Sequence, residues 1–155
     1  MTSSAPQKPS PEDFLDRVEF RDAALLSFVT SAIIVPAYDQ VKRDFGISRP
    51  EYMLLLCLSH YPVLTAQDVS RLTGRPRNSI SRAVHRMLAE GHIQRVPDPD
   101  DGRQARLSIT PSGRALHDKI AASMVDRQER VLAALDDEER KILADLLRKA
   151  SLHSS

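Results

Sequence analysis

Arginine and short polar side chains concentrate in one stretch of the chain, residues 65–110. Between Arg71 and Arg95 there are six arginines and a single acid, Glu90, although the whole chain has a formal net charge of only +1. Guanidinium, amide and hydroxyl groups are the side chains that hydrogen-bond the phosphates and base edges of nucleic acids. A local basic patch on a nearly neutral chain therefore indicates a surface that binds a polyanion.

The segment from about Asn78 to Glu90 carries these groups in a helical pattern. With about 100° between successive residues of a helix, Ile80, Val84 and Met87 share one face. The opposite arc is polar and basic and consists of Asn78, Ser79, Arg82, His85 and Arg86. We expect this helix to place that arc in the major groove of DNA. A solvated amphipathic face is the alternative that the helix taken by itself leaves open.

A β-hairpin is expected directly after this helix. Gly91 ends the helix, residues 92–96 predict a short strand, and residues 106–109 alternate as the returning strand. The segment between them is rich in Pro, Asp and Gly, which favour a turn. Arg103 at the tip has the size and charge to enter a minor groove, and Asp101 can orient its guanidinium. An ordinary acidic surface turn is the alternative for this segment.

Helix-capping signals divide the rest of the chain into the elements that hold this unit. With Ser10 as its N-cap, a helix should run from about residue 11 to residue 45, with a kink or break at Pro36. Ser48 and Glu51 predict a capping box for a helix that contains YMLLLCL and forms the centre of the core. A similar cap precedes the helix that begins at residue 66. Two more helices have apolar stripes: one follows residue 110, and the other begins at a cap formed by Asp136 and Glu139.

Composition excludes several classes of protein. The single cysteine, Cys57, excludes an intrachain disulfide framework and fits the reducing cytoplasm, where we expect the protein to act. The five histidines lack the paired spacing of metal ligands, so we expect no metal and no cofactor. The chain contains no H-E-x-x-H, no phosphate-binding glycine loop and no G-x-S-x-G motif, which argues against an enzyme.

Three motifs in this order carry a family resemblance: NSISRAVHRMLAEGHIQR, then DPDDGRQARLSIT, then PSGRAL. With these motifs the chain resembles the MarR family of winged helix-turn-helix transcriptional regulators, over roughly residues 14–147. The resemblance implies a mainly α fold with a small β-hairpin wing (α+β). It implies a winged helix-turn-helix domain at 47–110 and a helical dimerisation region at 11–46 and 111–150. Residues 1–10 should be disordered and 151–155 a frayed tail.

The resemblance also implies partners. It predicts a homodimer that presents two recognition helices to a pseudo-palindromic operator in double-stranded DNA, most often as a repressor. The candidate DNA-contacting residues are Thr65, Gln67, Arg75, Arg77, Asn78, Ser79, Ser81, Arg82, His85, Arg86, Arg103 and Arg106.

Family members are typically released from DNA by a small anionic, often phenolic effector. By that analogy the candidate ligand-binding residues are Phe28, Tyr38, Tyr52, Met53 and His60, although plain core packing explains each of them equally well. Two other functions stay open at this point. One is a redox-responsive regulator that acts through Cys57, and the other is a winged-helix module that binds protein instead of DNA.

Overall fold

The computed structural model describes residues 10–97 and 105–152. The chain divides into two compact units, residues 1–36 and 37–155, and all of the predicted winged helix lies in the second. The first unit holds α1 (Pro11–Leu15) and the first part of α2 (Arg21–Phe45). The hydroxyl of Ser10 accepts a hydrogen bond from the N–H of Asp13 at 3.0 Å, which confirms the predicted N-cap.

Of the kink or break predicted at Pro36, the break is wrong. The chain leaves the helical path at residues 16–20, and α2 continues through Pro36. At the true break, the N–H groups of Arg17 and Val18 bond only three residues back, to the carbonyls of Phe14 and Leu15. A proline inside a helix removes one backbone hydrogen bond, and the 25-residue helix α2 accommodates that loss.

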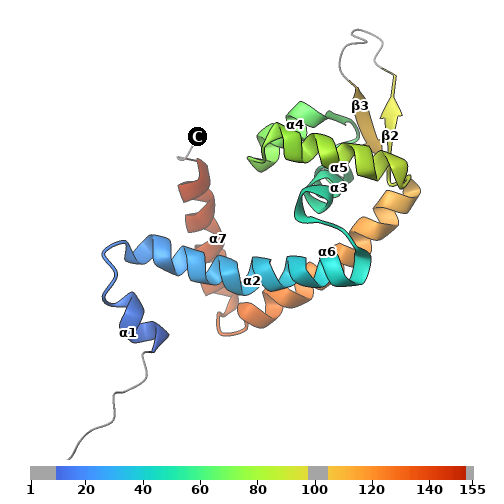
Figure 1. Cartoon of the computed structure of the whole chain (residues 1–155). Coiled ribbons are helices and arrows are strands. Elements are labelled where there is room, and N and C mark those ends of the chain that lie inside the picture. Colours follow the sequence, from blue (N-terminus) through green and yellow to red (C-terminus); the bar gives the residue numbers. More distant parts are fainter. Residues whose placement is uncertain (1–9, 98–104, 153–155) are drawn as a thin grey trace, which may run out of the picture. The chain divides into compact units, whose positions relative to one another are not determined.

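In the second unit, α3 (Arg49–His60) packs against α4 (Ala66–Thr73), α5 (Arg77–Ala89) and α6 (Pro111–Val131). Figure 1 shows α3 running behind α5. Its Leu54, Leu55 and Leu58 are completely buried. Because this helix is apolar nearly all round, it can contact neighbours on several sides at once. The prediction that residues 49–60 form the centre of the core is confirmed.

A three-stranded antiparallel sheet lies beside these helices, in the order β1-β3-β2. It consists of β1 (Leu64–Thr65), β2 (Ile93–Val96) and β3 (Arg106–Ile109), and the β2–β3 pair is the predicted hairpin. Figure 1 shows these two strands extending past α5. The short strand β1 was not predicted, because two residues are too few to show alternation.

Three capping boxes fix where helices begin. The carboxylate of Glu51 accepts from the N–H of Ser48 at 2.6 Å, and that of Asp68 accepts from the N–H of Thr65 at 3.0 Å. At the start of α7 (Asp137–Leu152), Asp136 and Glu139 exchange two such bonds, both at 2.9 Å. These caps are confirmed as predicted. Helix α7 extends to Leu152, past the point where the tail was predicted to fray.

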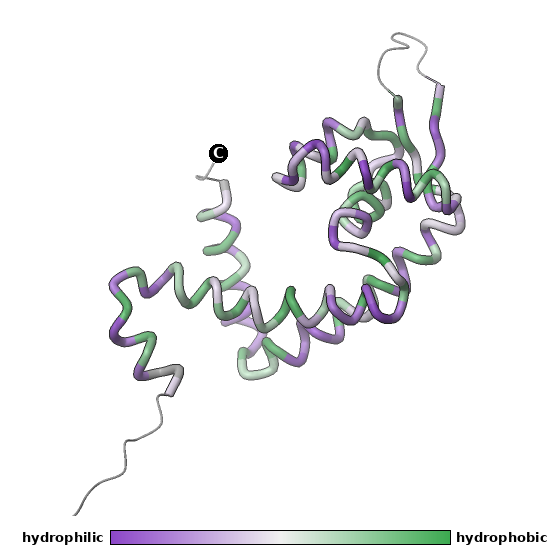
Figure 2. Tube along the Cα trace, viewed as in Figure 1, coloured by the Kyte–Doolittle hydropathy of each residue, from purple (hydrophilic) through white to green (hydrophobic). Residues whose placement is uncertain are grey.

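Exposed large apolar side chains are most numerous in two parts of the chain. In the first unit they include Phe14, Phe20, Leu25 and Leu26, and on α7 they are Ile142, Leu146 and Leu147. Figure 2 shows hydrophobic residues recurring along α2 and α7. Helix α2 is even long and apolar enough, by composition alone, to span a membrane. Exposed apolar surface of this extent marks a face that another surface covers.

Candidate nucleic-acid interface

Helix α5 separates its side chains as the sequence projection predicts. Ile80, Val84 and Met87 are buried against the core. The side chains of Arg77, Asn78, Ser81, Arg82 and His85 are exposed, and Ser79 is half-buried. Within residues 10–97 and 105–152, neither Arg77 nor Arg82 takes part in an ion pair. The first two turns of α5 thus present two arginines, an amide and a hydroxyl to a ligand from solvent.

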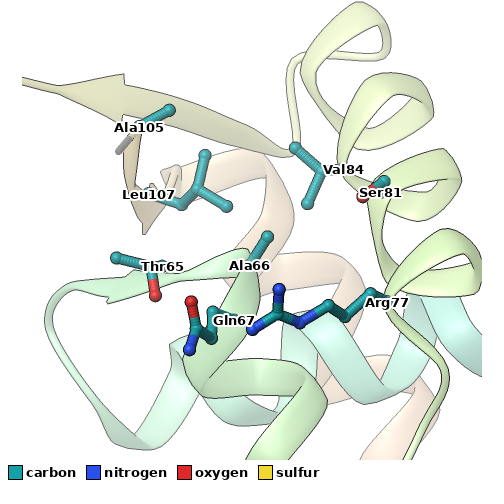
Figure 3. Close-up of a pocket in the computed structure, with 8 residues that line it drawn as sticks. All are labelled: Thr65, Ala66, Gln67, Arg77, Ser81, Val84, Ala105 and Leu107. Atoms are coloured by element: carbon teal, nitrogen blue, oxygen red, sulfur yellow. The ribbon is translucent and has the colours of Figure 1, made fainter. Parts of the chain in front are cut away.

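The N-terminus of α4 adjoins this face. Thr65 caps the helix, its hydroxyl oxygen accepting from the N–H of Asp68 at 3.1 Å, while Gln67 in the first turn is exposed. Between α4, α5 and β3 lies a hollow of about 310 Å³. Figure 3 shows Arg77 reaching from α5 toward Gln67 across it, with Ala66, Val84 and Leu107 as its apolar lining. A helix N-terminus beside an arginine is a favourable place for a phosphate group.

Two further predicted contacts lie at the edges of this face. Arg75, in the turn between α4 and α5, is half-buried, and its carbonyl accepts from the hydroxyl of Ser70 at 2.6 Å. Arg106 begins β3 and is also half-buried. Asp101 and Arg103, the predicted wing contacts, lie outside the residues that the structure describes.

Arg86 differs from Arg77 and Arg82 on the same helix, because the protein itself engages its guanidinium. Nη1 donates to both carboxylate oxygens of Glu51 at 3.1 Å, and Nε donates to Glu90 at 2.9 Å. Nη2 donates to the carbonyl oxygen of Gly46 at 3.0 Å. These carboxylates also raise the pKa of Arg86. The helical projection placed Arg86 on the outer arc, but it gave no sign of Glu51, which lies 35 residues earlier in the chain.

Four of the five predicted ligand-binding residues form a connected group in the second unit. The hydroxyl of Tyr38 donates to the sulfur of Met53 at 3.2 Å, and its ring meets Tyr52 edge-on at 6.1 Å. Burial raises the pKa of both phenols, that of Tyr52 to about 12, so both are neutral hydrogen-bond donors at neutral pH. Phe28 lies in the first unit, where its ring contacts Phe14 at 6.2 Å.

Sequence reasoning missed the residue that connects the fourth member, His60, to this group. His117 on α6 stacks on Tyr52 at 5.8 Å and meets His60 edge-on at 6.2 Å. It also missed Arg49, whose guanidinium lies 5.0 Å from the ring centre of Tyr38. The signal for His117 was present: it falls between Gly113 and Ile120 at the helical spacing of the buried side of α6.

The remaining reactive side chain is Cys57 on α3, which is half-buried. Burial raises the pKa of its thiol, and the thiolate is the form that oxidants attack. Among the described residues, no cluster of His, Cys, Asp and Glu is suited to hold a metal ion.

Known proteins are similar to this region in sequence and fold. Residues 45–104 match the MarR family. An HTH-type transcriptional repressor of Mycobacterium tuberculosis is 23% identical over 124 residues, which cover 80% of this chain and 89% of the repressor.

Two of the solved structures that are similar to this chain are regulators that bind DNA. BpsR of Bordetella bronchiseptica, whose DNA binding is regulated by 6-hydroxynicotinic acid, has a TM-score of 0.73 at 23% identity, over 84% of this chain and 98% of its own. A cysteine-to-serine variant of MarR from Escherichia coli, complexed with operator DNA, also has a TM-score of 0.73, at 17% identity, over 84% of this chain and 94% of its own.

The matched segment contains α3, β1, the helix-turn-helix formed by α4 and α5, and β2, which is the first strand of the wing. The repressor and both solved structures extend the similarity to most of the chain. Fold, motif order and relatives agree, and together they support a MarR-family winged-helix transcriptional regulator.

Proposed function

We propose that this protein is a repressor that binds a pseudo-palindromic operator as a homodimer and leaves it when a small aromatic, anionic effector binds. In this proposal α5 lies in the major groove, and Arg103 of the wing enters the minor groove. The N-terminus of α4, with Thr65 and Gln67, lies against a phosphate. The protein acts in the cytoplasm, as regulators of this family generally do.

The observation that carries the proposal is the sidedness of α5. Its apolar residues are buried, whereas Arg77, Asn78 and Arg82 extend into solvent beside the hollow at α4. Arginine pairs with guanine and asparagine with adenine in the major groove, which admits a single helix. A surface that bound only protein would not need this density of cationic and amide groups.

Homodimer formation is supported by exposed apolar side chains. Leu146 on α7 is 60% exposed and Phe20 in the first unit is 67% exposed. A second copy of the chain is the occupant that fits these faces, because two recognition helices then meet successive major grooves about 34–36 Å apart. The apolar composition of α2 has the same explanation, since one of its faces would be covered by the partner.

An effector site is proposed around Tyr38, Tyr52, Met53 and His60. The phenols are neutral donors, and Arg49 supplies a positive charge beside Tyr38. This chemistry suits an aromatic carboxylate. Regulation of BpsR by 6-hydroxynicotinic acid supports the same class of compound. Phe28 remains a prediction from the resemblance. The redox alternative has less support, because the thiol of Cys57 is half-buried and its pKa is raised.

The test is selection of bound DNA from a random pool, followed by titration of the selected operator. Arg82→Ala should weaken binding by about 1–3 kcal/mol, because an arginine that reads a base is lost. Arg103→Ala should weaken binding with little change in the preferred major-groove sequence. Arg130→Ala, an exposed arginine on α6, is the matched control and should bind as wild type.

Unchanged affinity in both Arg82→Ala and Arg103→Ala would contradict the proposed interface. Several phosphate contacts should make affinity for nucleic acid fall about 1,000-fold between 50 and 200 mM salt. An affinity that hardly falls over this range would favour the protein-binding alternative. Repeating the titration with a series of aromatic acids identifies the effector, as the compound that releases the operator.

A further inference from the structure

The guanidinium of Arg86 joins three elements of the second unit. Four hydrogen bonds of 2.9–3.1 Å connect it to Glu51 at the start of α3, to Glu90 at the end of α5 and to the carbonyl of Gly46. Gly46 follows the last residue of α2 in the left-handed conformation, with φ of +67°. An arginine has five N–H donors in a rigid fork. Although the side chain is 45% exposed, these contacts engage all three guanidinium nitrogens, so few N–H donors remain for DNA.

Glu51 is suited to hold Arg86 firmly. Its side chain is only 8% exposed, and its Oε2 also accepts the N–H of Ser48 at 2.6 Å in the capping box of α3. A buried carboxylate that loses its cationic partner is strongly unfavourable. The carboxylate of Glu51 thus caps the N-terminus of α3 and also binds Arg86 in the C-terminal half of α5. A substitution of Glu51 should therefore affect both the cap and the contact with α5.

The position of Arg86 gives this contact a consequence for DNA binding. It lies one helical turn after Arg82, on the same side of α5. The contacts to Glu51 and Gly46 therefore act on the helix that carries the exposed Arg77, Asn78 and Arg82. A recognition helix must be held firmly for its side chains to reach base edges, because a binding site whose residues are held only loosely loses most of its affinity.

We propose that Arg86 is a positioning residue for DNA recognition, which orients α5 through Glu51 and Gly46 and does not itself contact DNA. This inference rests on the proposed function, in which α5 reads the operator. It differs from the sequence prediction, which counted Arg86 among the DNA contacts. Replacing Arg86 should weaken operator binding whether Arg86 contacts DNA or only positions α5. The test therefore measures the salt dependence of binding and the effect of changing Glu51 as well as the affinity.

The experiment uses the full chain and the selected operator, with an unrelated duplex as the non-specific probe. Arg86→Gln should lower operator affinity about ten-fold, while affinity for the unrelated duplex and the slope of log K against log salt stay at the wild-type values. Arg82→Gln is the matched control from the previous turn. Because Arg82 is proposed to read a base, Arg82→Gln should lower operator affinity and relax the sequence preference at that base pair.

Three further variants test the route through Glu51. Glu51→Gln should reproduce the loss in operator affinity, and Arg86→Gln with Glu51→Gln should lose no more than the worse single variant. Arg86→Lys keeps the charge but cannot make the forked contacts, so it should bind the operator almost as weakly as Arg86→Gln. Thermal unfolding of each variant fixes a temperature at which all are folded.

A reduced salt slope for Arg86→Gln, near-normal binding by Arg86→Lys, or wild-type binding by Glu51→Gln would overturn the inference. With Arg82→Gln still impaired, any of these results leaves the proposed function standing. If the wild-type protein selects no operator, the inference about Arg86 and the proposed function are both overturned.

Discussion

His117 is a buried imidazole whose ring nitrogen Nδ1 has no hydrogen-bond partner among the described residues. The side chain is 7% exposed and stacks on Tyr52. Burial is the main cause that lowers the pKa of His117 below 6.5. The carboxylate of Asp118 opposes this shift, and the neighbouring His60 and Arg114 add to it. The folded protein therefore holds this ring in its neutral form.

This histidine should make the protein less stable in mild acid. As the pH falls below 6.5, the unfolded chain takes up a proton at His117 before the folded chain does, so the free energy of unfolding decreases. His117→Phe keeps an aromatic ring against Tyr52 but cannot be protonated. Urea unfolding between pH 7.5 and pH 5 should show a flatter decline for the variant than for wild type. Parallel curves would show that His117 is not the group responsible.

At the scale of elements, the wing and α6 are held together at one point. The N–H of Thr110 donates to the carbonyl of His92 at 3.1 Å, and its hydroxyl donates to the carbonyl of Gly91 at 2.7 Å. The same hydroxyl oxygen caps α6 by accepting from the N–H of Gly113 at 3.1 Å. A Cβ atom at Gly113 would overlap the carbonyl oxygen of His92. The start of α6 thus determines where β2 begins.

Gly113→Ala should destabilise the protein, although alanine favours a helix by about 1 kcal/mol over glycine. The overlap with the His92 backbone should cost about 1–3 kcal/mol or more beyond that gain, because backbone cannot move aside as a side chain can. Urea unfolding measures the change. Ala115→Gly, at an exposed position of the same helix, calibrates the propensity effect. A Gly113→Ala protein more stable than wild type would refute the close contact.

At the scale of the whole molecule, the exposed apolar residues mark the surface that a second copy should cover. On α7, Ile142 and Leu146 lie one turn apart and are 50% and 60% exposed. A winged helix by itself meets one half-site. In the proposed dimer, a partner that covers these faces would couple two such units, and the two half-sites together would supply the affinity that an operator requires.

Leu146→Asp should shift the protein from dimer to monomer and weaken operator binding, because a charge is placed in an apolar interface. The fold of each chain should persist, since Leu146 is exposed in the single chain. Sedimentation velocity and operator titration provide the two measurements. Ala144→Asp adds the same charge at another exposed position of α7, beside Lys141 and Arg148, and should remain dimeric. Dimeric Leu146→Asp protein, or monomeric wild type, would contradict the proposal.

The sequence alone determined the features that depend on near neighbours. The capping boxes of α3, α4 and α7 join residues three apart, so they were visible as Ser48 with Glu51, Thr65 with Asp68, and Asp136 with Glu139. The buried and exposed sides of α5 follow from helical periodicity, which one segment displays completely. The hairpin strands followed from alternation next to turn residues.

The tertiary structure decided what depends on residues far apart in the chain. The engagement of Arg86 requires Glu51, 35 positions earlier, and the burial of His117 requires Tyr52 on another helix. The strand β1 exists because β3 offers it hydrogen bonds. Such contacts are not visible in the sequence pattern of either segment, because the residue type and its position on a helix do not show which distant residue the fold will place beside it. The sequence therefore showed which side of α5 faces outward, and the tertiary structure showed which of its arginines is already engaged by the protein.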